Sequence, residues 1–481
     1  MVFKTFESQI LSASDMETIH AGSLAILERT GILVEHDQVL ECLADAGACV
    51  DFQKKLVRFP AELVERSLAA VPKRICLAGR EPEYDRELSP ESDFLIRCLS
   101  GPGLVSLEHG PGFRKASLQD QQDIAIIADG LPNIDCPGML SLQDVPLEIA
   151  DLFAAKTLLE HSRKHFMGLS LGSKNMQYLV EMQLAVRGTR QTMTQRPLFH
   201  GLICPISPLY YPRDEIEKLK VCAGNGLPLV VAVELMLGAT APVSLAGALV
   251  QGNAEVLGAI SLVQTLYPET PMPYYCFPSL TDMRTGKTMG GGPENMLLFA
   301  AFSRLGTRYY GLPVECPGLV SDGAYLGERM FQKGYGAAVA AASGASFLAG
   351  AGGLNRETVS CLQQLVIDDE IAAYTRRVSS GFRLDEETIG LEVVHRVGPR
   401  GHYLSDEHTF HHFRDEIRFY FELLDAGPAS EHGADQDGLL AQAGDQVQQM
   451  LKNHEVPPLD SSTVKTLEAI LKAAARDIVG D

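Results

Sequence analysis

The stretch YYCFPSLTDMRTGKTMGGGPEN, which begins at Tyr274, combines an aromatic strand, an acidic loop and a glycine turn ahead of an apolar helix. Tyr275 and Phe277 lie where the strand ends, and Asp282 follows in the loop. Because side chains of a strand alternate between two faces, at least one aromatic must face inward and offer a binding surface. Packing against neighbouring helices would account for the same residues.

A second candidate for chemistry is Glu234, a carboxylate within the apolar run PLVVAVELM at 228–236. A carboxylate buried in such a strand must be paired, be protonated or meet a cationic ligand. A salt bridge in the core and a contact with substrate both fit the pattern.

Composition limits the partners that this chain can have. It has 41 Lys and Arg against 61 Asp and Glu, a net charge of −20 over 481 residues. That charge repels phosphate backbones and anionic lipid, so neither nucleic acid nor a membrane is expected as a partner. No run of about 18 apolar residues and no leader pattern occurs, and ten cysteines lack CxxC spacing, so we expect a cytoplasmic protein with reduced thiols.

Strand-like runs alternate with helical patterns from about residue 94. Strands are predicted at 94–100, 134–140, 165–171, 198–204, 228–236, 271–279, 313–319 and 345–352. Each run is followed by a helical pattern, which suits a strand and a crossover helix per unit. Eight such units predict an α/β fold, a (β/α)₈ barrel. A doubly wound sheet is the alternative, but no GxGxxG turn follows the first strand.

Three regions follow from this division. Residues 1–90 are expected to form a helical extension with a short hairpin at GACVDFQKKLVRFP. Residues 91–380 are the predicted barrel. Residues 381–481 are a C-terminal helical extension, expected to pack on the outside of the barrel or on a neighbouring subunit of a homo-oligomer.

Zinc has to be weighed, because thiolate-bound zinc occurs in barrel enzymes. His200 and Cys204 share a strand face, and Cys98, Cys276 and Cys316 could converge on the same axis. The sequence has no HExxH motif and no CC pair, and cysteine is a common small filler, so no metal is predicted. A zinc-dependent barrel methyltransferase or hydrolase is kept as an alternative.

Several motifs resemble one known family. They are FPSLTDMRTG at 277–286, GATAPVSLAGALVQGNAEVL at 238–257, LPNID at 131–135, VGPRGHYL at 397–404 and the N-terminal block IHAGSLAILERTGILVE. Together they resemble the trimethylamine methyltransferase family over most of the chain. The resemblance implies a (β/α)₈ barrel that passes a methyl group from an amine to the Co(I) of a partner corrinoid protein. Cobalamin would come with that partner, and no cofactor would be bound permanently.

The founding members of this family carry pyrrolysine, whereas this chain shows only standard residues. It resembles the non-pyrrolysine branch, which implies a quaternary amine such as a betaine as substrate. A quaternary nitrogen already carries its charge, so the leaving tertiary amine needs no proton. The protein must then bind a cation, exclude water and align one methyl group, which aromatic faces and carboxylates can do.

The resemblance and the strand ends together suggest the site residues. The candidates for an aromatic cage are Tyr275, Phe277, Tyr210, Tyr211 and Tyr325. Glu234 and Asp282 are expected to supply the negative field. A betaine carboxylate would need an arginine, for which the candidates are Arg97, Arg329 and Arg356.

The sequence departs from its relatives at the last strand. Related chains often carry a histidine there in an HAAG-like run, whereas this chain reads FLAGAGGLN with Gly350 in that place. The loss of a side chain predicts a roomier pocket and a bulkier betaine, such as proline betaine, carnitine or a butyrobetaine. A protein that binds betaine without catalysis is the remaining alternative.

Overall fold

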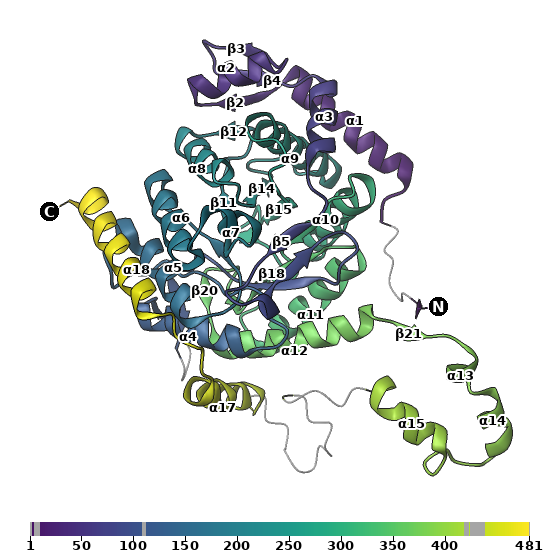
Figure 1. Ribbon diagram of the computed structural model, residues 1–481. Coiled ribbons are helices and arrows are strands. Elements are labelled where there is room, and N and C mark those ends of the chain that lie inside the picture. The colour runs from purple at the N-terminus through teal and green to yellow at the C-terminus, as the bar shows by residue number, and fades with distance from the viewer. Residues whose placement is uncertain (1, 4–9, 108–111, 418–422, 424–437, 481) are drawn as a thin grey trace.

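The computed structural model describes residues 2–3, 10–107, 112–417, 423 and 438–480. Short parallel strands lie at its centre with helices around them (Figure 1). The strands are β7 (Leu95–Cys98), β10 (Phe166–Gly168), β11 (Phe199–Ile203), β13 (Leu229–Val231), β14 (Val233–Leu237), β15 (Tyr274–Thr281), β17 (Val314–Cys316) and β18 (Phe347–Ala351). Two parallel ladders result, β10-β11-β13 and β14-β15-β17-β18-β7. Only Ala232 separates β13 from β14.

A helix follows nearly every strand, as predicted. These helices are α4 (Leu118–Gly130), α5 (Ala150–His161), α6 (Ser173–Arg187), α8 (Arg213–Gly224), α9 (Leu245–Leu266), α10 (Pro293–Arg304), α11 (Leu326–Ala342) and α12 (Leu362–Ser379), with the short α7 (Arg190–Gln195) after α6. Local signals fix their ends: Ser117 and Asp120 form a capping box on α4, and Pro293 begins α10. A π-helical turn, Leu305–Tyr309, continues α10.

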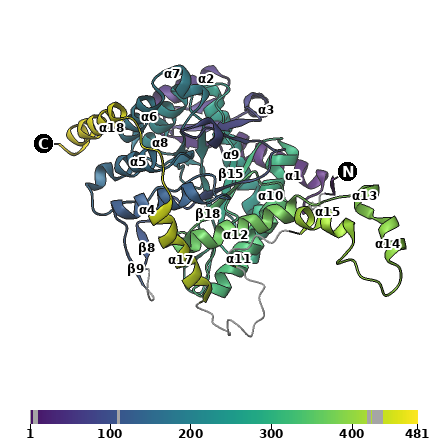
Figure 2. The ribbon, with the colours of Figure 1, turned by 60° about the horizontal axis from the view of Figure 1, so that its bottom comes forward.

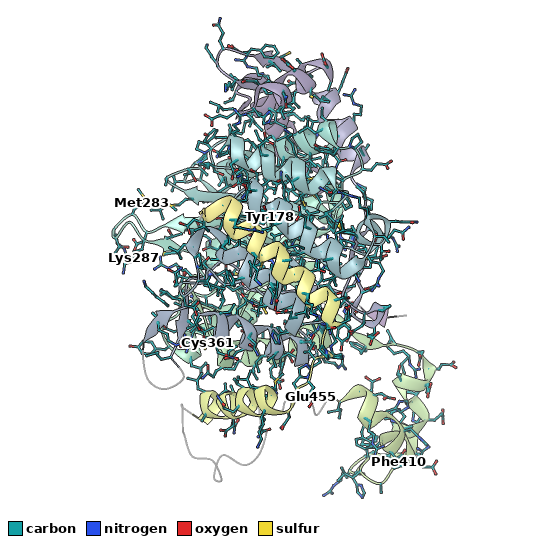
Figure 3. The ribbon with its side chains drawn as sticks, turned by 60° about the vertical axis from the view of Figure 1, so that its left-hand side comes forward. Tyr178, Met283, Lys287, Cys361, Phe410 and Glu455 are labelled. Carbon is teal, nitrogen blue, oxygen red and sulfur yellow. The ribbon has the colours of Figure 1, made fainter. Side chains whose placement is uncertain are left out.

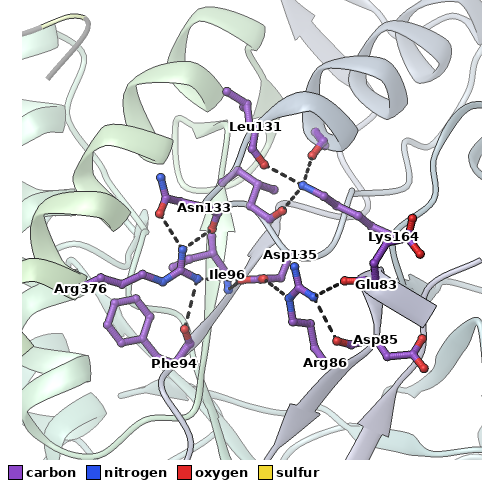
Figure 4. Close-up of polar contacts among 12 residues, drawn as sticks. Glu83, Asp85, Arg86, Phe94, Ile96, Leu131, Asn133, Asp135, Lys164 and Arg376 are labelled. Atoms are coloured by element: carbon purple, nitrogen blue, oxygen red, sulfur yellow. Dashed lines mark hydrogen bonds and ion pairs between the residues drawn. The ribbon is translucent and has the colours of Figure 1, made fainter. Parts of the chain in front are cut away.

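The predicted strand at 134–140 does not form. Only Cys136 makes a parallel bridge, to Arg97. At the start of the segment the Ile134 carbonyl accepts from the Lys164 ammonium at 2.5 Å, which also donates to the preceding Ala128 and Leu131 carbonyls, each at 2.7 Å (Figure 4). The Ile134 carbonyl therefore needs no strand partner, and the segment bonds to β7 through the backbone of Asp135 and Cys136.

Asp135 anchors the other side of the same segment. Its carboxylate accepts the backbone N–H of Ile96 at 2.9 Å and also binds Arg86 at 3.1 Å and Arg376 at 2.9 Å (Figure 4).

The parallel strands and the helices between them confirm the α/β class. A closed barrel is not confirmed, because among the described residues no ladder joins the segment 134–140 to β10.

The N-terminal region shares a sheet with the strand region. It comprises α1 (Ala13–Arg29), β2 (Ile32–Val34), α2 (Asp37–Asp45), β3 (Cys49–Asp51), β4 (Leu56–Arg58) and α3 (Ala61–Ala70). The predicted hairpin is present as β3 and β4, and β12 (Tyr210–Tyr211) extends their sheet in the order β12-β2-β4-β3. Helices α1 and α3 cover α9, which is long and apolar enough to cross a membrane, but 78% of its most apolar window is buried inside the protein.

A second hairpin from the first 90 residues was not foreseen. Its strands are β5 (Ile75–Leu77) and β6 (Arg86–Leu88), joined through the 3₁₀ turn Pro82–Tyr84. Its apolar side chains form one buried cluster with residues that begin the central strands: Ile75, Leu77, Leu88, Leu95, Cys136 and Phe347. The hairpin thus covers the amino-terminal end of the central strands and leaves their carboxyl-terminal end for a site.

Smaller strands gather at that carboxyl-terminal end. After β7 and β18 the chain forms one four-stranded sheet from β8 (Leu104–Ser106), β9 (Phe113–Lys115), β19 (Gly353–Leu354) and β20 (Val359–Ser360). β15 continues beyond its neighbours and pairs with β16 (Thr288–Met289) as a hairpin. The tip of this hairpin, with Met283 and Lys287, stands out from the body (Figure 3).

The C-terminal region has two parts. β21 (Phe382–Arg383) pairs with β1 (Val2–Phe3), and α13 (Glu386–Ile389), α14 (Leu391–Val397) and α15 (Glu407–Glu416) form an arm that projects from the body (Figures 1 and 2). None of these three helices has a buried residue. α17 (Gly438–Asn453) packs on α12 and α4, and α18 (Ser461–Ala474), with its π turn Ala475–Val479, packs on α5 and α6, so packing on the outside is confirmed for the last helices.

A buried ion pair fixes the end of β18. Lys333 and Asp368 are both fully buried, and their side chains meet at 2.7 Å. Lys333 also donates to the Gly350 carbonyl at 3.1 Å, and Asp368 accepts the Gly352 N–H at 2.7 Å. The pair therefore holds both sides of the turn that leaves this strand.

We expect Lys333→Met to lower the free energy of unfolding by about 3–5 kcal/mol, because it leaves Asp368 as a buried charge without its partner. Urea unfolding followed by circular dichroism measures the change. Lys333→Met combined with Asp368→Leu should recover much of the loss, since the unpaired charge is then gone. A single variant within about 1 kcal/mol of the wild type would contradict the assigned role.

Candidate active site

Strand register brings several polar side chains to the inner face of the central strands. Glu234 pairs with Phe277, and Tyr275 pairs with Glu315. Paired residues of parallel strands point to the same face, so these four side chains share it. Tyr275 packs there with Val230 and Ala232, four and two residues before Glu234.

An ion pair lies at the centre of this face. Arg97 of β7 and Glu315 of β17 are 8% and 1% exposed, and the Arg97 Nε atom lies 2.5 Å from the Glu315 carboxylate. Burial is the largest single effect and lowers the pKa of Arg97, but the charge and hydrogen bond of Glu315, together with Tyr275 and Glu357, outweigh it, so the pKa is raised overall. Arg97 therefore stays cationic, but its guanidinium is paired with Glu315. It is not the unpaired arginine that the sequence analysis suggested for a betaine carboxylate.

Glu234 stands closer to the carboxyl-terminal ends of the strands. Its side chain is solvent-exposed. Burial nevertheless raises the pKa of its carboxyl, and the charge of Glu357 raises it further. Exposure to solvent and a pKa raised by burial are compatible if Glu234 lines a solvent-filled space that the protein surrounds. A carboxylate in such a space can meet a cationic ligand.

Glu357, like Glu315, is a group that sequence reasoning missed. It follows β19, is half-buried and has a raised pKa for which burial is the main cause, partly offset by Arg97 and Lys333. A Cβ atom at Gly350 would lie 2.5 Å from the Glu357 carboxylate and 2.9 Å from the Leu319 carbonyl. The prediction of a roomier pocket at Gly350 is therefore wrong, because a carboxylate fills that space.

Tyr275 lies among these charged groups. It is 5% exposed, and its hydroxyl makes no hydrogen bond to a described residue. Burial raises the pKa of this hydroxyl well above its usual value, and Glu234 and Glu315 raise it further. A neutral phenol ring therefore faces the carboxylates, as a binding surface for a cation requires. Phe277 is half-buried beside this cluster and also packs against Phe299 of α10, with ring centroids 6.2 Å apart.

Two histidines lie deeper in the strand region. The Nε2 atom of His165 is 3.0 Å from the Nδ1 atom of His200, and the other His165 nitrogen donates to the Pro197 carbonyl. Burial lowers the pKa of His165 to about 4 and that of His200 well below its usual value, so both rings are neutral. This pair adds no charge to the carboxylates.

The cysteines do not converge as a zinc site requires. Cys276 packs in the core cluster shared with α9 and α10, and Cys98 and Cys316 pack in a second cluster with α4, α11 and α12. Only Cys204 joins the cluster around Tyr275. Burial raises the pKa of Cys98, Cys204 and Cys316 to about 12, so these thiols stay protonated. Among the described residues no group of three or more His, Cys, Asp or Glu side chains could hold a metal ion.

The other predicted aromatics lie away from this cluster. Tyr210 donates its hydroxyl to Glu35 at 2.7 Å, and Tyr211 is 2% exposed, both in the sheet shared with the N-terminal region. Tyr325 is 74% exposed and precedes α11. The structure thus brings Tyr275 and Phe277 to Glu234, but not these three tyrosines.

Asp282 is engaged in its own hairpin. Its carboxylate accepts the Arg284 N–H and the Thr285 hydroxyl, each at 2.9 Å. Hydrogen bonds from Arg284 lower the pKa of Asp282 to about 2. Its hydrogen bonds all lie within residues 282–287, so Asp282 shapes the hairpin tip rather than joining Glu234.

The remaining arginines differ in their partners. Arg356 donates to the Thr288 carbonyl and lies 3.7 Å from Asp322, whose carboxylate also accepts the Gly290 and Gly291 N–H groups. Arg329 is half-buried, and its Nε atom has no hydrogen-bond partner among the described residues. Arg329 is thus the predicted arginine with an unused donor.

Surface grooves lie elsewhere on the protein. One of about 350 Å³ lies between α11, α12 and α17, and its lining is mainly apolar, including Met330 and Ile367. A larger one, of about 1090 Å³, lies between α4, α12 and α17. Neither includes a residue of the cluster around Glu234, whose convergent charges are the stronger mark of a site.

A family model described as trimethylamine methyltransferase matches residues 2–478. The chain belongs to the trimethylamine methyltransferase family. It is 30% identical to a glycine betaine methyltransferase of Desulfitobacterium hafniense, over 98% of each chain. It is 29% identical to a trimethylamine methyltransferase of the same species, over 96% of this chain and 93% of that one. These relatives identify it as a methyltransferase.

Solved structures agree on the fold of this methyltransferase. The monomethylamine methyltransferase of Methanosarcina barkeri has a TM-score of 0.51 at 11% identity, over 94% of this chain and 96% of that one. A hydroxylamine complex of a monomethylamine methyltransferase gives a TM-score of 0.52 at 12% identity, with the same coverage. At this identity the likeness concerns the fold alone.

We expect Glu234→Gln to stabilise the unliganded methyltransferase at alkaline pH. The pKa of Glu234 is raised on folding, so wild-type stability falls as the pH rises through that raised value. The variant lacks this loss, so it should gain up to about 1 kcal/mol, because solvent at Glu234 screens the repulsion. Below the ordinary glutamate pKa of 4.5 the two proteins should unfold alike.

Unfolding midpoints measured across pH test this expectation. The exposed Glu392→Gln, on the projecting arm, removes the same charge and serves as the control. An equal gain in both variants would mean that net charge, rather than the surroundings of Glu234, is responsible.

Proposed function

We propose that this methyltransferase removes a methyl group from a quaternary ammonium substrate and transfers it to the Co(I) of a corrinoid held by a partner protein. The observation that carries the proposal is Glu234, a solvent-accessible carboxylate beside Tyr275 and Phe277 within an enclosing protein. Relatives named for trimethylamine and for glycine betaine support a substrate with a methylated nitrogen.

The proposed methyl transfer needs no proton or electron from the protein. The Co(I) electron pair forms the new bond to the methyl carbon, and the nitrogen keeps the electrons of the broken C–N bond. The amine therefore leaves neutral, and no general acid is needed. The protein has to bind the cation, exclude water and hold one methyl group in line.

The described side chains can meet these needs. Glu234 would attract the ammonium group, and Tyr275 and Phe277 would offer it their ring faces. The β15–β16 hairpin with Asp282 at its tip stands beside this end of the strands, where we propose that the corrinoid partner docks. The site would then lie at the carboxyl-terminal ends of the strands, as in a (β/α)₈ barrel.

The same proposal covers the organisation of the chain. Residues 91–380 would form the catalytic unit, with extensions at 1–90 and 381–481, in a cytoplasmic homo-oligomer. The projecting arm supports an oligomer, since it exposes large apolar side chains that a second copy could cover: Ile389, Leu391, Val394, Leu404 and Phe410.

A methyl-transfer assay tests the function. The purified protein is mixed with a corrinoid protein reduced to Co(I) and with one amine at a time: choline, tetramethylammonium, glycine betaine, proline betaine, carnitine or butyrobetaine. The cobalt absorbance spectrum should change to that of methyl-Co(III) with at least one of them. No change, with a Co(I) protein that accepts methyl groups from another methyltransferase, would favour a binding protein without catalysis.

We expect Tyr275→Leu to raise the KM for the quaternary amine about tenfold, because one desolvated cation–π contact contributes about 1–2 kcal/mol. Tyr275→Phe keeps the ring face and should stay within about threefold of the wild type. Initial rates of the same cobalt assay give both values. Equal losses in the two variants would assign the effect to the hydroxyl instead.

A further inference from the structure

The turn that carries Glu357 has an uncommon backbone. Asn355, Arg356 and Glu357 have φ values of 47°, 57° and 64°, three consecutive left-handed residues without a glycine. Each such residue costs roughly 1–2 kcal/mol relative to right-handed backbone. Backbone strain of this kind persists only where surrounding contacts enforce it, and it is concentrated at functional sites.

Contacts of Arg356 enforce this turn. Its backbone N–H donates to the Ser321 carbonyl at 3.0 Å, and its guanidinium binds the Thr288 carbonyl and lies 3.7 Å from Asp322. The Asn355 side chain closes the turn on Thr358 at 3.0 Å. With the turn held from outside, the Glu357 side chain points inward to the space left open by Gly350.

The charges on the inner face do not balance. Glu234, Glu315 and Glu357 are opposed by Arg97, whose charge is paired with Glu315. Lys333 lies close enough to lower the pKa of Glu357, but its own hydrogen-bonded partner is Asp368. His165 and His200 are neutral. Glu234 and Glu357 are therefore two carboxyl groups without a cation of their own, and the pKa of each is raised.

Polar groups of two buried side chains point to a ligand independently of these carboxylates. Tyr275 is 5% exposed, and its hydroxyl, which keeps some solvent access, has no hydrogen-bond partner among the described residues. The second carboxylate oxygen of Glu315, in a residue 1% exposed, also lacks one. Buried polar atoms in proteins are normally satisfied, so unfilled ones beside a charged cluster mark a place that a ligand or its water completes.

We propose that Glu357 is the second carboxylate of the ammonium site, and that Glu234 and Glu357 together select a quaternary ammonium substrate with no carboxylate next to its nitrogen. This inference rests on the proposed function for the place where substrate binds. An ammonium group between two carboxylates is stabilised by both, whereas the carboxylate of glycine betaine would be brought against them. A choline-like cation fits this charge pattern.

Choline and glycine betaine form a matched pair of probes, since they differ only in CH₂OH against COO⁻ beside the same trimethylammonium group. Isothermal titration of the full chain with each probe, without a corrinoid partner, measures the preference. We expect choline to bind at least about tenfold more tightly than glycine betaine. Glu357→Gln, which keeps the size of the side chain, should reduce that ratio at least about fivefold.

Two further variants complete the design. Glu392→Gln, on the projecting arm, should leave the ratio unchanged. Arg356→Met removes the anchor of the turn and should shift the ratio in the same direction as Glu357→Gln. Unfolding midpoints measured for each variant show whether it is folded.

The outcomes separate this inference from the proposed function. Tighter binding of glycine betaine by the wild type, an unchanged ratio in Glu357→Gln, or no binding of either probe would each overturn it. Choline binding without methyl transfer from any of the six amines to a competent corrinoid protein would support the ammonium site and overturn the proposed reaction. Methyl transfer from glycine betaine alone would support the proposed reaction and overturn the preference for a substrate without a carboxylate next to its nitrogen.

Discussion

The Arg97–Glu315 ion pair determines which charges the central strands present to a ligand. Both side chains are almost completely buried, and Arg97 is the arginine whose charge lowers the pKa of both Glu234 and Glu357. A buried pair of this kind resists separation, because either partner alone would be a desolvated charge. Arg97 is thereby committed to Glu315, and the two carboxyl groups Glu234 and Glu357 are left without a cation of their own.

Polar contacts also decide where the sheet stops. Lys164 and Asp135 bind the segment that would otherwise be the second strand, and the hairpin of β5 and β6 fills the amino-terminal end with apolar side chains. Solvent therefore reaches the inner face from the carboxyl-terminal end, where Glu234 is exposed. The position of the site follows from this closure at one end.

Periodicity in the sequence predicts most of the fold, since seven of the eight expected strands and the helices between them are present. It fails at 134–140, because IDCPGML is as apolar as a strand, whereas the contacts that replace strand pairing come from side chains elsewhere in the sequence: Lys164 binds the Ile134 carbonyl and Gln121 binds the Gly138 carbonyl. Glu234 and Glu315 share one signal, an acidic residue in an apolar strand. Glu357 has none, because a left-handed turn without glycine leaves no local pattern, and its place opposite Gly350 depends on tertiary contacts.

The anchoring of Arg356 has a mechanical consequence. Through the Thr288 carbonyl and Asp322 it joins the exposed β15–β16 hairpin and the Gly290–Gly291 backbone to the turn that carries Glu357. These contacts tie the hairpin to the turn, so a displacement of the hairpin has to move the turn that carries Glu357 or break the contacts of Arg356. An event at the outer surface is thereby linked to the position of a carboxyl group inside the protein.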